Sequence, residues 1–191
     1  EQRTENPRVA GSIPALGTFP FKYTIILLSS RITTFRSDSL FLIYEVMREC
    51  HMGKIFYLMG KSACGKDSLH KALLADPTLG LKSAVLYTTR PMRENEVDGV
   101  DYFFVTEQKV SELEQSGRII EMRTYDTIYG PWKYLTVDDG QFDSEDADYL
   151  MIGTLASYQT LQQYFGKERL IPLYIEVEDG ERLRRALNRE R

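Results

Sequence analysis

The stretch GKSACGKDS, residues 60–68, decides the expected fold of this chain. It has the spacing of a phosphate-binding loop, G-x-x-x-x-G-K-[ST], in which glycines let successive backbone N–H groups turn toward phosphate oxygens. An apolar run at 54–59 is typical of a buried strand, and residues 67–75 carry apolar side chains at helical spacing. A helix N-terminus after such a loop favours an anion. We predict a nucleotide phosphate site made of Gly60, Lys61, Ser62, Ala63, Cys64, Gly65, Lys66, Asp67 and Ser68.

The last position of this pattern departs from the consensus. Lys66 is expected to reach over the β and γ phosphates, but the next residue, which normally ligates Mg²⁺ through a hydroxyl, is Asp67. A carboxylate is a hard oxygen ligand that suits Mg²⁺, and the metal would then separate it from the phosphates. We therefore expect a Mg²⁺ site with Asp67 as the candidate ligand. Ser68 stays open as an alternative, although it would point to a different side of the helix.

The bulk composition is that of one ordinary globular domain. The chain has 191 residues, of which 42% are hydrophobic and 27% charged. A net charge of −4 gives no general attraction to nucleic acid or to anionic membranes. The two cysteines, Cys50 and Cys64, are too few for a disulfide framework. The apolar runs 23–28 and 39–44 are shorter than the roughly 20 residues of a membrane helix, and no signal peptide is visible. We expect a cytoplasmic protein with small-molecule partners; its oligomeric state stays open.

From residue 52 onward, strand-like and helix-like segments alternate. Strands are predicted at 83–89, 102–105, 118–125, 148–152 and 170–177, and helices at 106–116, 154–165 and 179–190. Such alternation predicts an α/β fold with a parallel sheet, which binds ligands at the carboxyl ends of its strands.

Residues 1–51 have a different character. Prolines and glycines interrupt the first twenty positions, and no helical or strand period persists. The phrase GSIP, residues 11–14, matches a reading frame through the T-arm of a transfer RNA gene. Our hypothesis is that Met52 is the natural first residue and that 52–191 is the functional domain. A genuine N-terminal extension remains the alternative.

A second motif, TTRPMRENEVDGVDYFFV at residues 88–105, indicates a phosphate acceptor site. Arg90 and Arg93 would be costly to bury unpaired, whereas planar guanidinium groups clamp a phosphate well. The stretch resembles the guanylate kinase signature T-T-R-x-x-R-x-x-E-x-x-G-x-D-Y-x-F and matches it at every fixed position. The resemblance covers roughly residues 53–191, densely as far as Gly130.

This resemblance implies a P-loop kinase fold, in which helices flank a parallel sheet and a small mixed-β acceptor subdomain spans about 88–137. It implies transfer of the γ-phosphoryl group of ATP to GMP with Mg²⁺. By position, Lys66 and Arg90 become catalytic residues, and Arg90, Arg93 and Tyr102 become ligands of the GMP phosphate.

The next segment, GRIIEMRTYDTIYG at residues 117–130, resembles the following family motif. It implies that Glu121 reads guanine and that Tyr129 contacts phosphate. A carboxylate can accept hydrogen bonds from both N1–H and the exocyclic amine of guanine, a donor pair that adenine lacks. The alternative for Glu121 is an exposed strand residue in a solvated ion pair.

Several positions depart from the family pattern. Leu86 and Pro131 replace hydroxyl residues, and Thr154 stands where an acidic guanine contact is expected. Residues 181–191 resemble the start of the arginine-bearing lid, with Arg185 and Arg189 as candidate catalytic residues. The rest of the lid is absent, so the chain is expected to be a fragment that can be inactive by itself.

Two other functions stay open. A ribose 1,5-bisphosphate phosphokinase is similar in having G-K-D-S at the phosphate loop, but it does not usually keep the complete second motif. A guanylate-kinase-like binding module uses the acceptor cleft for peptides, but such modules usually lose the lysine and glycines of the loop.

Overall fold

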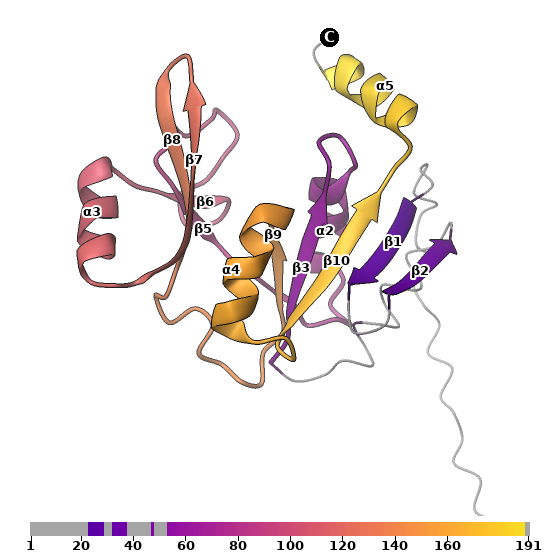
Figure 1. Cartoon of the computed structure of the whole chain (residues 1–191), viewed down its shortest axis with the longest axis horizontal. Coiled ribbons are helices and arrows are strands. Elements are labelled where there is room, and N and C mark those ends of the chain that lie inside the picture. The colour runs from indigo at the N-terminus through magenta and orange to yellow at the C-terminus, as the bar shows by residue number, and fades with distance from the viewer. Residues whose placement is uncertain (1–22, 29–31, 38–46, 48–52, 190–191) are drawn as a thin grey trace, which may run out of the picture.

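The larger of two sheets holds the phosphate loop. The computed structural model describes residues 23–28, 32–37, 47 and 53–189. The larger sheet has the order β2-β1-β10-β3-β9-β4 (Figure 1). Its strands are β1 (Tyr23–Leu28), β2 (Ile32–Ser37), β3 (Ile55–Gly60), β4 (Lys82–Ser83), β9 (Tyr149–Ile152) and β10 (Leu170–Glu176). Strands β10, β3, β9 and β4 run parallel, and β1 and β2 join them antiparallel at one edge.

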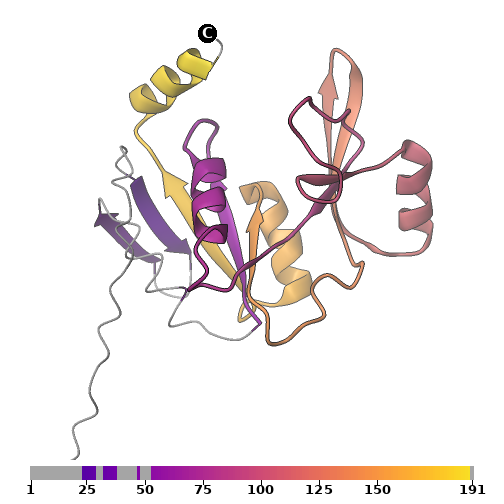
Figure 2. The ribbon, with the colours of Figure 1, turned by 180° about the vertical axis from the view of Figure 1, so that it is seen from behind.

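Helices cover both faces of this sheet, which explains why β3 is apolar throughout. Helix α2 (Lys66–Leu74) packs on one face and α4 (Leu155–Phe165) on the other, as the opposite views in Figures 1 and 2 show. Side chains alternate along a strand, so Phe56 and Leu58 join the core on the α2 side while Tyr57 and Met59 join the α4 side. The predicted parallel sheet with flanking helices is confirmed.

The carboxyl ends of two parallel strands create the site. β3 and β9 are neighbours, with Leu58 opposite Ile152, and the Gly153 N–H donates to the Leu58 carbonyl at 3.0 Å. The loop after β3 leads into α2, and Thr154 after β9 caps α4. The phosphate loop and the 153–154 segment therefore lie side by side.

The smaller sheet has the order β6-β5-β8-β7 and forms a separate layer beside the larger one (Figure 1). It consists of β5 (Leu86–Thr88), β6 (Tyr102–Phe104), β7 (Ile119–Thr127) and β8 (Gly130–Val137), with α3 (Glu107–Gln115) packed against it. This is the predicted mixed-β subdomain, although β8 was not predicted as a strand.

The strand predicted at 83–89 is in fact two strands in different sheets. β4 belongs to the larger sheet and β5 to the smaller one. Between them, the Gln141 side chain accepts from the Val85 N–H at 2.9 Å and donates to the Val85 carbonyl at 3.2 Å. A distant amide group thus satisfies the backbone where the chain crosses between sheets.

The N-terminal region contributes more structure than its sequence suggested. The hairpin β1–β2 pairs with β10, and Met47 is 2% exposed within the core on the α2 side. The GSIP segment, Cys50 and Met52 lie outside the described residues, so the division at Met52 stays a prediction.

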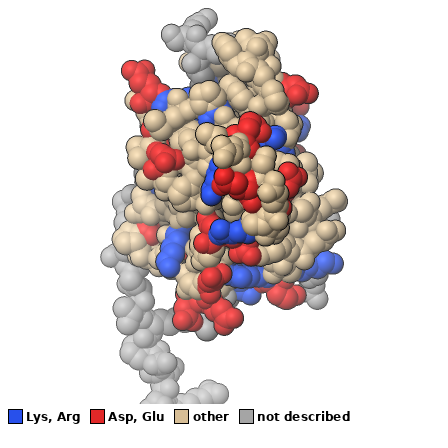
Figure 3. All heavy atoms as spheres, turned by 90° about the vertical axis from the view of Figure 1, so that its left-hand side faces the viewer, with Lys and Arg blue, Asp and Glu red and all other residues tan. Residues whose placement is uncertain are grey.

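The face built by α3 and the β7–β8 hairpin carries acidic and basic side chains interspersed with uncharged ones (Figure 3). Within the described ranges, no helix combines the length and the apolar character that crossing a membrane requires.

Candidate functional site

The phosphate loop is shaped by one steric constraint and two left-handed residues. A Cβ on Gly60 would lie 2.6 Å from the Cys64 Sγ atom and 2.7 Å from the Ile175 carbonyl oxygen, so only glycine fits. Ala63 has a φ of 60° and Gly65 a φ of 91°, and the Leu69 N–H then starts the helix by donating to the Gly65 carbonyl. A loop with left-handed residues at alternate positions can turn its backbone N–H groups inward, which forms a concave nest that suits an anion.

Lys66 is half-buried at the start of α2, and none of the described carboxylates forms a salt bridge with it. Its ammonium group is therefore available to a phosphate. Asp67 is exposed in the first turn and lines a cavity of about 450 Å³ together with Arg90 and Arg93. Among the described residues, no cluster of three side chains that could hold a metal ion occurs.

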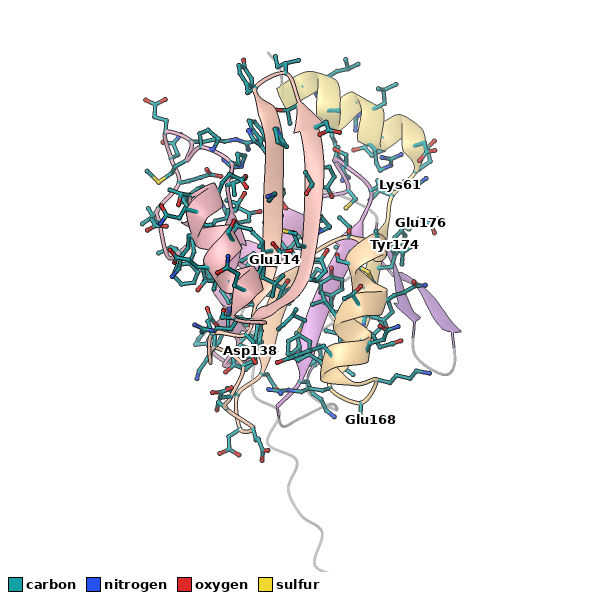
Figure 4. The ribbon with its side chains drawn as sticks, turned by 60° about the vertical axis from the view of Figure 1, so that its left-hand side comes forward. Lys61, Glu114, Asp138, Glu168, Tyr174 and Glu176 are labelled. Carbon is teal, nitrogen blue, oxygen red and sulfur yellow. The ribbon has the colours of Figure 1, made fainter. Side chains whose placement is uncertain are left out.

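Helix α5 (Asp179–Arg189) is tied to the loop by three basic side chains. Lys61 forms an ion pair with Asp179 at 3.4 Å, and Figure 4 places Lys61 beside the start of α5. Arg182 donates to the Ser62 carbonyl at 2.9 Å, and Arg185 donates to the Cys64 carbonyl at 3.4 Å. The predicted residue Arg185 thus reaches the loop, whereas the side chain of Arg189 lies outside what the structure describes.

Arg90 is the most enclosed of the predicted phosphate ligands. It is 4% exposed, and its two Nη atoms donate to the two carboxylate oxygens of Glu96 at 2.9 and 2.8 Å. Its guanidinium carbon lies 5.4 Å from the ring centre of Tyr102 and 5.5 Å from that of Phe104. The hydrogen bonds to Glu96 raise the pKa of Arg90 and lower that of Glu96. The Arg90 guanidinium group is therefore already paired with the Glu96 carboxylate.

A second cavity, of about 570 Å³, joins the two halves of the site. Lys66 from the phosphate loop lines it together with Arg93 and Tyr102 from the second motif. Arg93 is exposed and makes no salt bridge with any described residue, while burial raises the pKa of the Tyr102 hydroxyl. Both cavities also share Leu86, which the sequence had marked as a departure from the family pattern.

Glu121, predicted to read guanine, lies on β7 beside Arg123. It is 6% exposed and does not line either cavity; burial raises the pKa of its carboxyl group. Its Oε1 lies 2.9 Å from the Arg123 Nε without an aligned hydrogen bond, and its Oε2 has no partner among the described residues. Arg123 also donates from Nη1 to the Thr154 hydroxyl at 3.2 Å and lines the 570 Å³ cavity. The alternative of an exposed, solvated ion pair is wrong, because Glu121 is buried and its partner Arg123 is only partly exposed.

Tyr129 is likewise not brought to the cavities. It lies at the tip of the β7–β8 hairpin with 78% of its surface exposed, stacked on Trp132 at a ring distance of 6.3 Å. Trp132 itself lines the 570 Å³ cavity, as do Tyr125 and Tyr134.

Sequence reasoning assigned no role to Glu96, Arg123 or Arg182. Glu96 is a fixed position of the motif at 88–105, six residues after Arg90, so its pairing was detectable. Arg182 precedes Arg185 by three residues, the spacing of one helical face. For Arg123, no local pattern predicts the contact with Thr154.

A nest-forming loop at the carboxyl end of a parallel sheet, facing a small sheet with basic side chains, defines a P-loop kinase fold. The family model described as guanylate kinase matches residues 52–135. This match covers less than half of the chain, and it makes residues 52–135 similar to the guanylate kinase family.

Individual proteins show the same similarity. The chain is 44% identical over 84 residues to the guanylate kinase of Mycoplasma mobile, a match that covers 44% of this chain and 42% of that protein. The chain thus spans less than half the length of this relative. The crystal structure of guanylate kinase from Anaplasma phagocytophilum matches with a TM-score of 0.55 at 22% identity, covering 72% of this chain and 68% of that one. This structural likeness supports the fold.

Proposed function

We propose that this chain is the nucleotide-binding part of an enzyme that transfers the γ-phosphoryl group of ATP to GMP, giving ADP and GDP. One observation carries the proposal: Lys66 of the phosphate loop and Arg93 and Tyr102 of the acceptor motif line the same cavity of about 570 Å³. Donor and acceptor phosphates bound there would lie next to each other. A cavity of this size is typical of sites for nucleotide-sized ligands.

On the donor side, the backbone amides of the loop and Lys66 would hold the β and γ phosphates of ATP. Arg182 and Arg185 add positive charge beside the loop carbonyls of Ser62 and Cys64. Asp67 and the phosphate oxygens would hold Mg²⁺, whose charge neutralises that of the phosphates. These groups stabilise the charge that spreads over the transferred group in the transition state.

On the acceptor side, Arg93 and Tyr102 would hold the phosphate of GMP in line with the γ-phosphate. Arg90 lies in the adjoining cavity, fixed by Glu96 and by two aromatic rings. Its remaining N–H groups would contribute to the same phosphate. The roles of Glu121, Tyr129 and Arg189 stay predictions. The buried free thiol of Cys64 fits a cytoplasmic location, which is also part of the proposal.

The test is a coupled assay of ADP formation with GMP, dGMP, AMP and ribose 1,5-bisphosphate as acceptors. It is run on this chain and on any longer natural protein that contains it. We expect turnover with GMP, and loss of turnover by a factor of about 100 or more in Lys66→Met. Turnover only with ribose 1,5-bisphosphate would replace the proposal with the sugar kinase. A folded protein that is inactive with every acceptor would favour the binding module.

A further inference from the structure

We propose that Arg123, rather than Glu121, reads the base of the acceptor, and that the acceptor class is the 6-oxopurine nucleoside monophosphates. In this class a 2-amino group is not required, so IMP is accepted alongside GMP. The inference rests on the proposed function and specifies the substrate of the same site.

The register of the β7–β8 hairpin places Arg123 in the wall of the cavity. Arg123 pairs with Tyr134 and Tyr125 pairs with Trp132, and all four side chains line the 570 Å³ cavity. Residues two apart on a strand share a face, and directly opposed residues lie side by side on it. Arg123 is therefore bordered by aromatic rings that can stack on a purine.

Glu121 lies one step further along this face and outside the cavity. It pairs with Thr136, which is 1% exposed, and it is itself 6% exposed. Arg123 lies between it and Thr154, with Nε 2.9 Å from the Glu121 carboxylate and Nη1 donating to the Thr154 hydroxyl. A carboxylate in this position orients the guanidinium group instead of meeting the ligand.

The charges around the cavity point to a ligand that accepts hydrogen bonds. Lys66, Arg93 and Arg123 line it, and none of the described residues in its lining carries a carboxylate. Lys66 and Arg93 are assigned to phosphates, which leaves Arg123 for the base. No described residue accepts a hydrogen bond from the Arg123 Nη2 group, so this donor remains for the ligand.

The purine edges differ in what they offer to a guanidinium group. Guanine and hypoxanthine present two acceptors, O6 and N7, to which arginine binds as a fork. Adenine replaces O6 with an amino group, a donor that would face the guanidinium donors unpaired. Since no carboxylate reaches the cavity, the exocyclic 2-amine of guanine has no acidic partner there. The geometry thus selects for the 6-oxo group.

The test compares the affinities of GMP, IMP and AMP for this chain by isothermal titration, with ribose 5-phosphate as a probe of the phosphate site alone. We expect GMP and IMP to bind within about tenfold of each other and AMP at least about tenfold more weakly than either. Arg123→Lys keeps the positive charge beside Glu121. In this variant the affinities for GMP and for IMP should both fall by about tenfold or more. The affinity for ribose 5-phosphate should not change. A general structural defect would lower this affinity as well, so the probe separates the two causes.

A second variant avoids leaving a buried charge without its partner. The double change Glu121→Gln with Arg123→Gln leaves a neutral pair, and it should lower the preference for GMP over AMP while thermal unfolding shows a folded protein. Glu121→Gln alone should leave the ratio of GMP to IMP affinity near one.

Two results would overturn the inference. A preference for GMP over IMP of about a hundredfold that Glu121→Gln abolishes would assign base reading to Glu121. If both Arg123 variants keep the base preference of the parent, Arg123 only connects β7 to α4 and does not read the base. If ribose 5-phosphate binds but no purine nucleotide does, the proposed function itself fails.

Discussion

At the scale of single residues, the phosphate loop depends on a contact that its pattern does not reveal. The pattern demands a glycine at residue 60 for the turn. The structure adds that the position faces the Ile175 carbonyl of β10, one strand away in the sheet. Loop shape and sheet pairing are therefore coupled at Gly60.

Gly60→Ala should lower the free energy of unfolding by about 1–3 kcal/mol, because backbone must move to admit the new Cβ. Urea unfolding of the purified chain measures this change. Gly180→Ala is the matched control, since its Cβ would meet only the exposed side chain of Glu178 at 3.2 Å. If Gly60→Ala is as stable as the parent, loop shape and sheet pairing are not coupled at this position.

Variants of Asp67 test the proposed Mg²⁺ site at the same scale. Asp67→Ala should raise the Mg²⁺ concentration needed for half-maximal ADP formation by about tenfold or more, because a charged oxygen ligand is lost. Asp67→Ser restores the consensus hydroxyl and should be less affected. Activities of both variants equal to that of the parent over the whole Mg²⁺ range would remove Asp67 from the metal site.

At the scale of elements, the pattern of the sequence predicted most helices and strands but not how they meet. Helices α3 and α4 begin within one residue of the predicted positions, because their caps, Thr106 and Thr154, are polar residues that precede periodic segments. Strand β8 was not predicted. The segment 83–89 was predicted as one strand, because the contact that separates β4 from β5 comes from the distant Gln141 side chain. The exposure of Tyr129 depends on where the β7–β8 hairpin turns.

The same limit applies to the candidate site. The residues of the loop and the acceptor motif were predictable because their chemistry follows from spacing. The burial of Glu121 and the approach of Arg123 to Thr154 were not, because they depend on how β7 packs against α4. The pairing of Arg90 with Glu96 could have been predicted from the sequence, since both are fixed positions of one motif.

The ion pair in the loop between β5 and β6 predicts a pH dependence of stability. The hydrogen bonds from Arg90 lower the pKa of Glu96 below its ordinary value of 4.5, so the folded state favours the ionised form. This contribution is present above pH 4.5 and is lost as the pH falls through the lower folded-state pKa. Unfolding midpoints of the parent and Glu96→Gln should therefore differ most at neutral pH and converge in strong acid. A difference that grows on acidification would contradict this sign.

At the scale of the whole molecule, the open point is how the N-terminal residues relate to the P-loop core. β1 and β2 extend the sheet from β10, and Met47 packs among the core residues Phe56 and Leu173. The described residues before Met52 are therefore in contact with the predicted domain.

Met47→Ala should lower the free energy of unfolding by about 2–5 kcal/mol, the usual effect of truncating a buried side chain. Met92→Ala is the control, since Met92 is 55% exposed. Thermal or urea unfolding of both variants provides the comparison. If Met47→Ala is as stable as Met92→Ala, the Met47 side chain does not contribute to the core.

The central claim is that the 570 Å³ cavity is a site for GMP, and equilibrium binding tests it without requiring phosphoryl transfer. Isothermal titration of GMP into the purified chain should show one saturable site. Arg93→Ala, which breaks no salt bridge among the described residues, should weaken binding by about tenfold or more because a charged phosphate contact is lost. A folded chain that does not bind GMP, or an Arg93→Ala variant with unchanged affinity, would contradict the account.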